Sequence, residues 1–271
     1  MDKWQVFTRR LFNEADADPG YYAVMFSGLP QDQRDRLVVA WCAFYNLGLA
    51  CKLSELRGQR FYQGMQRMFD TVPPVKRGSE RRHFRGRQGQ NAITTWADLF
   101  PQPEDMVEYI LQPAYKKRAY VDIRARTNNV PMMGPYFAWK WCDLREVLFA
   151  KPVDFTGAEK FSPPVPQKGA EMLFPEMPIE QAYATIVDYA RAKNVRTLTG
   201  PKREFGIQEA ETVCCVYHQY AAGKYLYGIR TAKAIARLEA EPCDASEALI
   251  AALLHTSPYS RRDLRALLDR G

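Results

Sequence analysis

The residues with the clearest chemical meaning in this sequence are the cations between positions 76 and 87. This run holds one acid, Glu80, and six cations: Lys76, Arg77, Arg81, Arg82, Arg85 and Arg87. The planar fork of arginine matches phosphate oxygens two at a time. We therefore expect the five arginines to bind phosphate. The same run could instead be a solvated basic loop that attracts DNA without touching a reacting group.

The rest of the chain is also basic. Its 38 lysines and arginines exceed its 31 acids, which gives a net charge of +7 and a pI near 9.0. Two further clusters contribute, namely Lys116, Lys117, Arg118, Arg124 and Arg126, and then Arg261, Arg262, Arg265 and Arg270. This surplus favours a polyanionic partner such as DNA.

Cysteine and histidine do not form a metal-site pattern. The six cysteines include no C-x-x-C pair, and none of the three histidines is spaced with a cysteine like a zinc ligand. We expect reduced, mostly buried thiols and no metal site. The phosphate loop of nucleotide kinases, G-x-x-x-x-G-K-[ST], is absent from the sequence as well.

The spacing of apolar residues indicates that helices position these residues. Hydrophobic residues make up 46% of the chain, typical of a globular protein, and the longest apolar run, 37–51, is too short and too polar to span a bilayer. The N-terminus lacks a secretory signal pattern, so we expect a cytoplasmic protein. Helical periodicity predicts two helices within 31–69, others over 103–114 and 115–126, and more from 179, over 207–220 and over 245–268.

The aromatic stripe of the first helix, with Trp41 and Tyr45, is interpreted as core. Six of the eighteen prolines fall between 151 and 178. We expect an extended connection there instead of a regular element. The chain would then be a single all-α catalytic domain, 1–271, with lobes at about 1–150 and 179–271 around a cleft.

A helical hairpin is the most legible local feature. Asn128 and Asn129 end one helix, Gly134 could supply a positive φ, and Pro135 suits the first position of the next helix. That helix would present one apolar face and place Lys140, Asp143 and Glu146 on the other. The hairpin amides would point outward, where a DNA phosphate fits.

The segment V-P-M-M-G-P-Y-F-A resembles the L-P-G-V-G-x-x-T-A hairpin of helix-hairpin-helix DNA glycosylases. Met132 stands at the first glycine of that pattern, and Tyr136 stands where glycosylase-lyases have a lysine. The resemblance implies DNA contacts by Met132, Met133, Gly134, Tyr136 and Lys140. It also implies a catalytic aspartate about twenty residues beyond the hairpin glycine, and Asp154 occupies that position. Without a ligand, the segment would be an ordinary helix–turn–helix.

Three segments resemble the bacteriophage amino acid:DNA transferases, also called alpha-glutamyl/putrescinyl thymine pyrophosphorylases, which are related to the glycosylases. They are RGSERRHFRG, ETVCCVYHQYAAGKYLYG and FYNLGLACKLSE. The family pattern Tyr-x-x-Gly-Lys-Asp reads here from Tyr225 to Gly228 and then Ile229 and Arg230, so roles of that lysine and aspartate do not carry over. The resemblance implies a helix-hairpin-helix fold and no cofactor.

The resemblance further implies a reaction on DNA. A phosphorylated or pyrophosphorylated 5-hydroxymethyluracil would lose its leaving group to the amine of a free amino acid, after an upstream base kinase has acted. The arginines would stabilise the leaving group. Asp154 would accept the proton of the amine or stabilise the reacting carbon, with Glu80 and His83 as second choices. The bulky hairpin residues suggest a small amino acid such as glycine or serine.

The remaining assignments each have a structural alternative. Arg124 and Arg126 could hold the amino acid carboxylate, and Tyr136 or Tyr225 could line the base pocket or wedge the duplex. Cys215 and His218 could also face that pocket, although the pattern favours core packing for Cys215 and a packed or capping histidine for His218. Asp154 could be a turn residue before Thr156. A DNA glycosylase and a non-catalytic DNA-binding module remain the alternative functions. If phage-encoded, the protein would act in the host cytoplasm.

Overall fold

A computed structural model describes residues 2–13, 17–71, 86–111, 118–149, 152–197 and 204–269. Fifteen α-helices lie in these ranges. They are α1 (Lys3–Asn13), α2 (Pro19–Phe26), α3 (Gln31–Phe44), α4 (Leu47–Ser54), α5 (Gly58–Thr71), α7 (Gly86–Leu99), α8 (Pro103–Leu111), α9 (Tyr120–Asn128), α10 (Pro135–Phe149), α11 (Pro164–Leu173), α12 (Ile179–Ala192), α13 (Ile207–Ala221), α14 (Ile229–Ala240), α15 (Ser246–Thr256) and α16 (Arg261–Leu268). The all-α prediction is confirmed, and the helix-hairpin-helix relationship stays a prediction.

The described strands form one small parallel pair, β1 (Arg118–Ala119) with β2 (Val153–Asp154). Helix boundaries at 179 and 207 agree with the sequence prediction. The prediction of two helices over 31–69 was wrong, because this range holds three, whereas the helical pattern over 245–268 corresponds to α15 and α16. α14 was not predicted. No helix among the described residues is long and apolar enough to cross a membrane.

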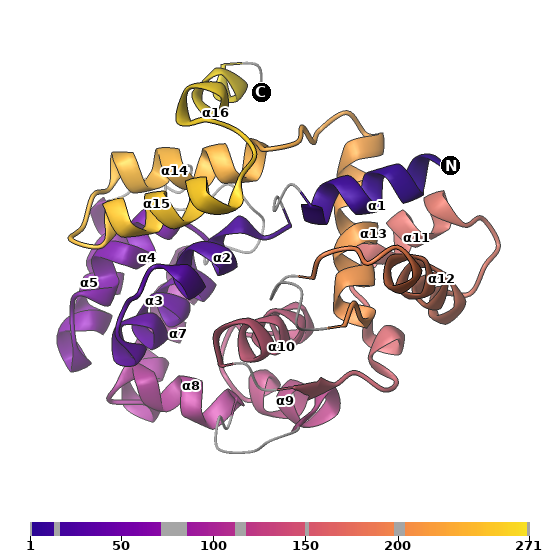
Figure 1. The fold of residues 1–271 in the computed structure, drawn as a ribbon. Coiled ribbons are helices and arrows are strands. Elements are labelled where there is room, and N and C mark those ends of the chain that lie inside the picture. Colours follow the sequence, from indigo (N-terminus) through magenta and orange to yellow (C-terminus); the bar gives the residue numbers. More distant parts are fainter. Residues whose placement is uncertain are drawn as a thin grey trace.

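Helix α10 occupies the centre of the molecule, where it contacts α2, α8 and α9 (Figure 1). Trp139 and Trp141 are at most 1% exposed, as expected for its apolar face. The charged residues expected on the other face, Lys140, Asp143 and Glu146, are also buried. A helix surrounded on all sides must pair its charges internally. Lys140 and Asp143 form such a pair.

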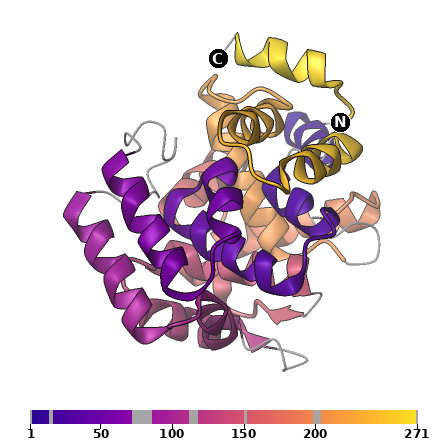
Figure 2. The same cartoon turned by 90° about the vertical axis from the view of Figure 1, so that its left-hand side faces the viewer.

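Segments far apart in the sequence pack together around α10. α14 and α15 lie against α2, α14 also lies against α4, and α1 lies against α12 and α13 (Figure 1). α4 and α14 approach closely at Gly48 of α4, where an added Cβ would lie 2.0 Å from the carbonyl oxygen of Arg237 in α14. The two lobes at about 1–150 and 179–271 remain a proposal. Figure 2 shows α16 on the outside of the molecule, beyond α14.

The proline-rich stretch contains regular structure, so the expectation of an extended connection was wrong. Its described residues form β2, a 3₁₀ helix over Ala158–Phe161 and α11. Pro164 and Pro166 lie in the first turn of α11, where a missing backbone N–H leaves no hydrogen bond unmade. At Gly169, the backbone of α11 approaches the carbonyl oxygen of Cys214, which an added Cβ would meet at 1.9 Å.

Two cysteines correct the expectation of reduced thiols throughout. Cys51 of α4 and Cys243, which follows α14, form a disulfide whose Cα atoms are 6.2 Å apart. The sequence spacing could not reveal this pair, because 192 positions separate its members. Cys42, Cys142, Cys214 and Cys215 form no disulfide among the described residues and are buried, as expected.

Candidate active site

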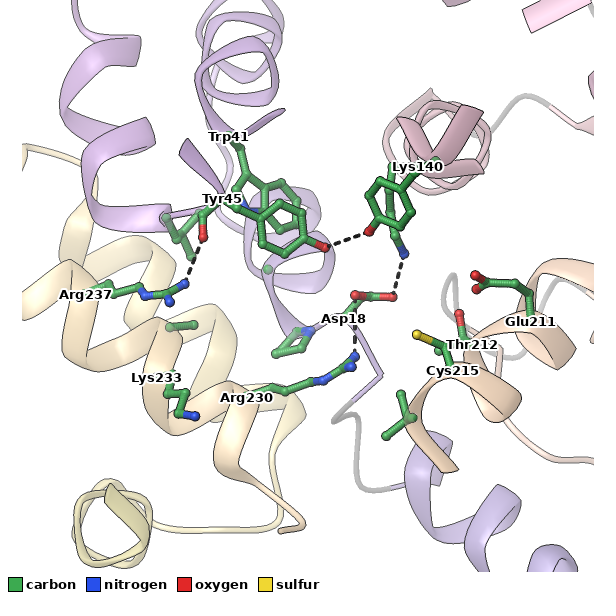
Figure 3. Close-up of a pocket in the computed structure, with 16 residues that line it drawn as sticks. Asp18, Trp41, Tyr45, Lys140, Glu211, Thr212, Cys215, Arg230, Lys233 and Arg237 are labelled. Atoms are coloured by element: carbon green, nitrogen blue, oxygen red, sulfur yellow. Dashed lines mark hydrogen bonds and ion pairs between the residues drawn. The ribbon is translucent and has the colours of Figure 1, made fainter. Parts of the chain in front are cut away.

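A cavity, the central cavity, lies beside α10 where the ends of several helices meet (Figure 3). Its walls come from residues distant in sequence: the start of α2, the end of α3, the start of α4, and one face each of α10, α13 and α14. Its aromatic and charged lining residues are Trp41, Tyr45, Tyr136, Asp18, Lys140, Glu211, Arg230, Lys233 and Arg237.

Aromatic rings form one side of the central cavity. Trp41 and Tyr45 lie with ring centroids 5.5 Å apart and planes inclined by 32°, and the Tyr45 hydroxyl lies 3.5 Å from that of Tyr136. Gly20 allows close approach here, since a Cβ at that position would lie 2.9 Å from the Trp41 ring. The prediction that this stripe packs in the core is confirmed, because Trp41 is buried in the core and Tyr45 packs against it. The same two rings also line the central cavity, which the stripe did not indicate. Flat rings at a cavity wall suit stacking with a nucleobase.

The backbone of Tyr45 is held in an uncommon conformation. Tyr45 ends α3 with φ 50°, in the left-handed region that non-glycine residues seldom adopt. Its N–H donates a hydrogen bond of 2.6 Å to the Trp41 carbonyl, and its own carbonyl accepts one of 2.9 Å from Nη1 of Arg237. Arg237 of α14 therefore helps to hold the backbone of Tyr45, whose ring forms part of the aromatic side of the cavity.

Buried ion pairs form the floor of the central cavity. Nζ of Lys140 lies 3.3 Å from a carboxylate oxygen of Asp18 and 3.1 Å from one of Asp143, and Arg230 lies 3.6 Å from the other oxygen of Asp18. Asp18 precedes α2 with φ 49° and makes no side-chain cap. Burial raises the pKa of Asp143 to about 7, because it outweighs the opposing effect of Lys140.

The two remaining walls carry opposite charges. α13 contributes the buried carboxylate of Glu211, with Thr212 and Cys215 beside it. α14 contributes Arg230, Lys233 and Arg237, spaced three and four residues apart and so on one helical face (Figure 3). Lys233 is exposed, and within the described part of the chain it has no ion-pair partner.

The predicted hairpin between α9 and α10 is present, with one correction. The positive φ, 66°, belongs to Met132 and not to Gly134. Met132 stands at the first glycine of the glycosylase hairpin pattern, so the residue differs while the backbone conformation is one that glycine favours. Met132 is 42% exposed and Gly134 is exposed. Met133 is 1% exposed and its sulfur accepts a hydrogen bond from Trp141, so it belongs to the core and cannot touch a duplex there.

Three of the predicted site residues, Tyr136, Lys140 and Cys215, meet in the central cavity. Asp154 is not among the residues that line it. Its Oδ1 accepts hydrogen bonds from the backbone N–H and the hydroxyl of Thr156, at 3.1 and 2.7 Å, which is the turn alternative. Tyr225 is buried among the rings of Phe7 and Tyr227.

Other predicted residues lie elsewhere or outside the described ranges. The guanidinium of Arg124 lies 4.2 Å from the centre of the Phe161 ring, and Arg126 donates to the Tyr109 carbonyl, so both arginines are engaged away from the central cavity. His218 lies on α13 and does not line the cavity. Arg87 is exposed in the first turn of α7. Arg77, Glu80, Arg81, Arg82, His83 and Arg85 fall outside the described residues.

Sequence reasoning missed Asp18, Trp41, Tyr45, Glu211, Lys233 and Arg237. Arg230 was missed as well, although one signal was available for it. Arg230 stands two residues after Gly228, where the family pattern has its aspartate. Glu211 likewise begins a segment that resembles the transferases. Asp18 carries no local signal, because its role depends on Lys140, which lies 122 positions away.

The chain is similar to known proteins over most of its length. Residues 4–225 match the family described as amino acid:DNA transferase. The chain is 27% identical over 249 residues to a glycinyltransferase of Pseudomonas phage PaMx11, covering 81% of this chain and 84% of that protein. It is 26% identical over 239 residues to a putrescinyltransferase of Delftia phage PhiW-14, covering 82% of this chain and 74% of that protein.

Proposed function

This chain belongs to the amino acid:DNA transferase family, and from that membership we propose a specific reaction. The enzyme replaces the phosphate or pyrophosphate of phosphorylated 5-hydroxymethyluracil in DNA with the amine of a free amino acid, such as glycine or serine. The reaction belongs to thymine hypermodification in a phage and takes place in the host cytoplasm. A base kinase must act first to supply the phosphorylated substrate.

The reaction is a substitution without oxidation or reduction. The amino acid ammonium loses one proton, and the freed nitrogen forms a C–N bond to the exocyclic methylene carbon of the base. The C–O bond to the leaving group breaks, and its electron pair departs on the phosphate oxygen. The enzyme must therefore accept a proton and stabilise an anion.

One observation supports this proposal most directly: the central cavity brings aromatic rings, cations and a buried carboxylate together. The target base would be turned out of the duplex and would stack on Trp41 and Tyr45. Tyr136, at the start of α10, follows the hairpin directly, so a hairpin that holds the DNA backbone would lie beside the cavity that receives the base.

Glu211 is our candidate for the group that accepts the amine proton. It lines the central cavity, it is 4% exposed, and it lies on the wall opposite the α14 cations. It replaces Asp154 as the first candidate, because Asp154 lies outside the cavity lining. The arginines of 77–87 remain our candidates for the leaving group. Glu80 and His83 remain second candidates for proton transfer.

A nucleoside digest tests the reaction. The protein is incubated with a duplex that carries phosphorylated or pyrophosphorylated 5-hydroxymethyluracil and with one amino acid at a time, and the DNA is then digested to nucleosides. We expect a nucleoside with a new C–N bond and release of phosphate or pyrophosphate. Free base with abasic DNA would identify a glycosylase instead, and unchanged DNA with retained binding would identify a DNA-binding module.

A further inference from the structure

We propose that the central cavity binds its nitrogen donor as a zwitterion, with the donor carboxylate on Lys233 and Arg230 of α14 and its amine toward Glu211 of α13. The inference rests on the proposed function, since it assumes that this cavity is the transfer site. It selects a small amino acid over a diamine, a choice left open by relatives that include a glycinyltransferase and a putrescinyltransferase.

The first argument is the separation of charge across the cavity. Glu211 stands on α13, whereas Arg230 and Lys233 stand on the facing side of α14 (Figure 3). A free amino acid near neutral pH carries one ammonium and one carboxylate. It can therefore place its ammonium beside an acid on one wall and its carboxylate beside cations on the other.

The second argument concerns which cations are available to a ligand. Lys140 is 6% exposed and lies between the carboxylates of Asp18 and Asp143, so its charge is already compensated within the protein. Arg230 shares Asp18 with Lys140 at the longer distance of 3.6 Å, and its side chain is 21% exposed. Lys233 is exposed and, within the described residues, lacks an ion-pair partner. A donor carboxylate would bring a negative charge to Lys233 and Arg230 on this wall of the central cavity.

The third argument is repulsion. A diamine would carry a second ammonium toward Lys233 and Arg230, where like charges oppose binding. Arg124 and Arg126, the carboxylate partners suggested by sequence, are engaged with Phe161 and Tyr109 and do not line the cavity. The α14 cations take their place as the carboxylate site.

The test compares donors that differ in charge. Initial rates of transfer onto the phosphorylated duplex are measured with glycine, glycinamide and 1,4-diaminobutane, for the wild type and for Lys233→Gln. Lys193→Gln is the matched control, because Lys193 is exposed at the end of α12. Glycinamide keeps the amine and the size of glycine but lacks the carboxylate.

We expect the wild type to use glycine with a kcat/KM at least about tenfold higher than either alternative donor, the typical effect of one charged hydrogen bond. Lys233→Gln should raise the KM for glycine about tenfold and leave the KM for glycinamide and for the duplex unchanged. Lys193→Gln should behave as the wild type.

Equal use of glycine and glycinamide, or preference for the diamine, would overturn the inference and leave the proposed function intact. The inference would also fall if Lys233→Gln raised the KM of the duplex instead of that of glycine, since Lys233 would then bind the DNA or its leaving group. Absence of transfer with every donor would overturn the proposed function. In that case, calorimetric titration of glycine and glycinamide into the protein–duplex complex still decides whether the carboxylate site exists.

Discussion

Lys140 of α10 and Asp18, the residue before α2, form a buried ion pair with 3.3 Å between Nζ and a carboxylate oxygen. The pair joins the central helix to an element that lies 122 positions earlier in the chain. Through Asp18 it also reaches Arg230 of α14. One lysine therefore links three walls of the central cavity, and its removal would disturb both folding and the site.

We expect Lys140→Met to lower the free energy of unfolding by about 3 kcal/mol at pH 8, because it removes the cation that the buried carboxylates of Asp18 and Asp143 share. The loss should be smaller at pH 5, where Asp143 is protonated. Urea unfolding at both pH values measures this. Lys168→Met on the exposed side of α11 is the control and should change stability little. An equal loss at both pH values would contradict the pairing with Asp143.

The raised pKa of Asp143 predicts a second pH dependence. The folded protein binds this proton up to about pH 7, whereas the unfolded chain releases it near the ordinary value of 3.8. The stabilising contribution is full below about pH 4 and is lost as the pH rises to about 7. The free energy of unfolding cannot fall by more than about 1.4 kcal/mol per pH unit through the titration of this single group.

Asp143→Asn should therefore gain stability relative to the wild type between pH 5 and pH 8. Unfolding curves of both proteins across this range give the difference directly. A difference that does not vary with pH would show that Asp143 is not the titrating group.

The contact between α4 and α14 predicts a large effect from one methyl group. Gly48→Ala places a Cβ against the backbone carbonyl of Arg237, which no rotamer change can relieve. We expect a loss of about 2 kcal/mol or more. Transfer activity should also fall, because Arg237 holds the carbonyl of Tyr45. Gly134→Ala is the control for stability, since an added Cβ there has no atom within 4 Å. Similar stability of the two variants would refute the close packing.

The hairpin predicts opposite outcomes for two neighbouring methionines. Met132→Gly relieves a left-handed backbone, worth about 1 kcal/mol, and this offsets the flexibility that glycine adds to the unfolded chain. Its stability should stay close to that of the wild type. Met133→Gly empties a core position and should cost about 3 kcal/mol.

DNA affinity by fluorescence anisotropy supplies a second readout for Met132→Gly. A phosphate could approach the hairpin backbone more closely without the Met132 side chain, so we expect tighter binding. Weaker binding would argue against a phosphate at the hairpin.

Two carboxylates compete for the role of proton acceptor, and their amides separate them. Glu211→Gln should lower kcat by at least about 100-fold, the usual size of general base catalysis. Asp154→Asn should retain most of the activity, because its Oδ1 accepts hydrogen bonds from Thr156 outside the cavity lining. The reverse result would restore Asp154 as the catalytic residue.

Sequence patterns predicted the local features of this fold well. Helical periodicity indicated an all-α chain, and the asparagines and Pro135 marked both ends of the hairpin because caps and turns depend on neighbouring residues. The same patterns could not tell that Trp41 and Tyr45 line a cavity, since a stripe that packs on a core looks identical. They also could not identify Asp18 as a site residue, because the cavity whose floor it helps to form is built from six helices that are distant in the sequence.

The packing of α1 against α12 and α13 bears on how the protein matures during synthesis. α1 leaves the ribosome long before α12 and α13 have been made. It can complete its packing against them only after residue 221 has been translated. α2 can pack on α10 earlier, but its contacts with α14 and α15 also form only when the last third of the chain has been made. We therefore expect a nascent chain stalled midway to leave the contact faces of these helices exposed to chaperones and proteases.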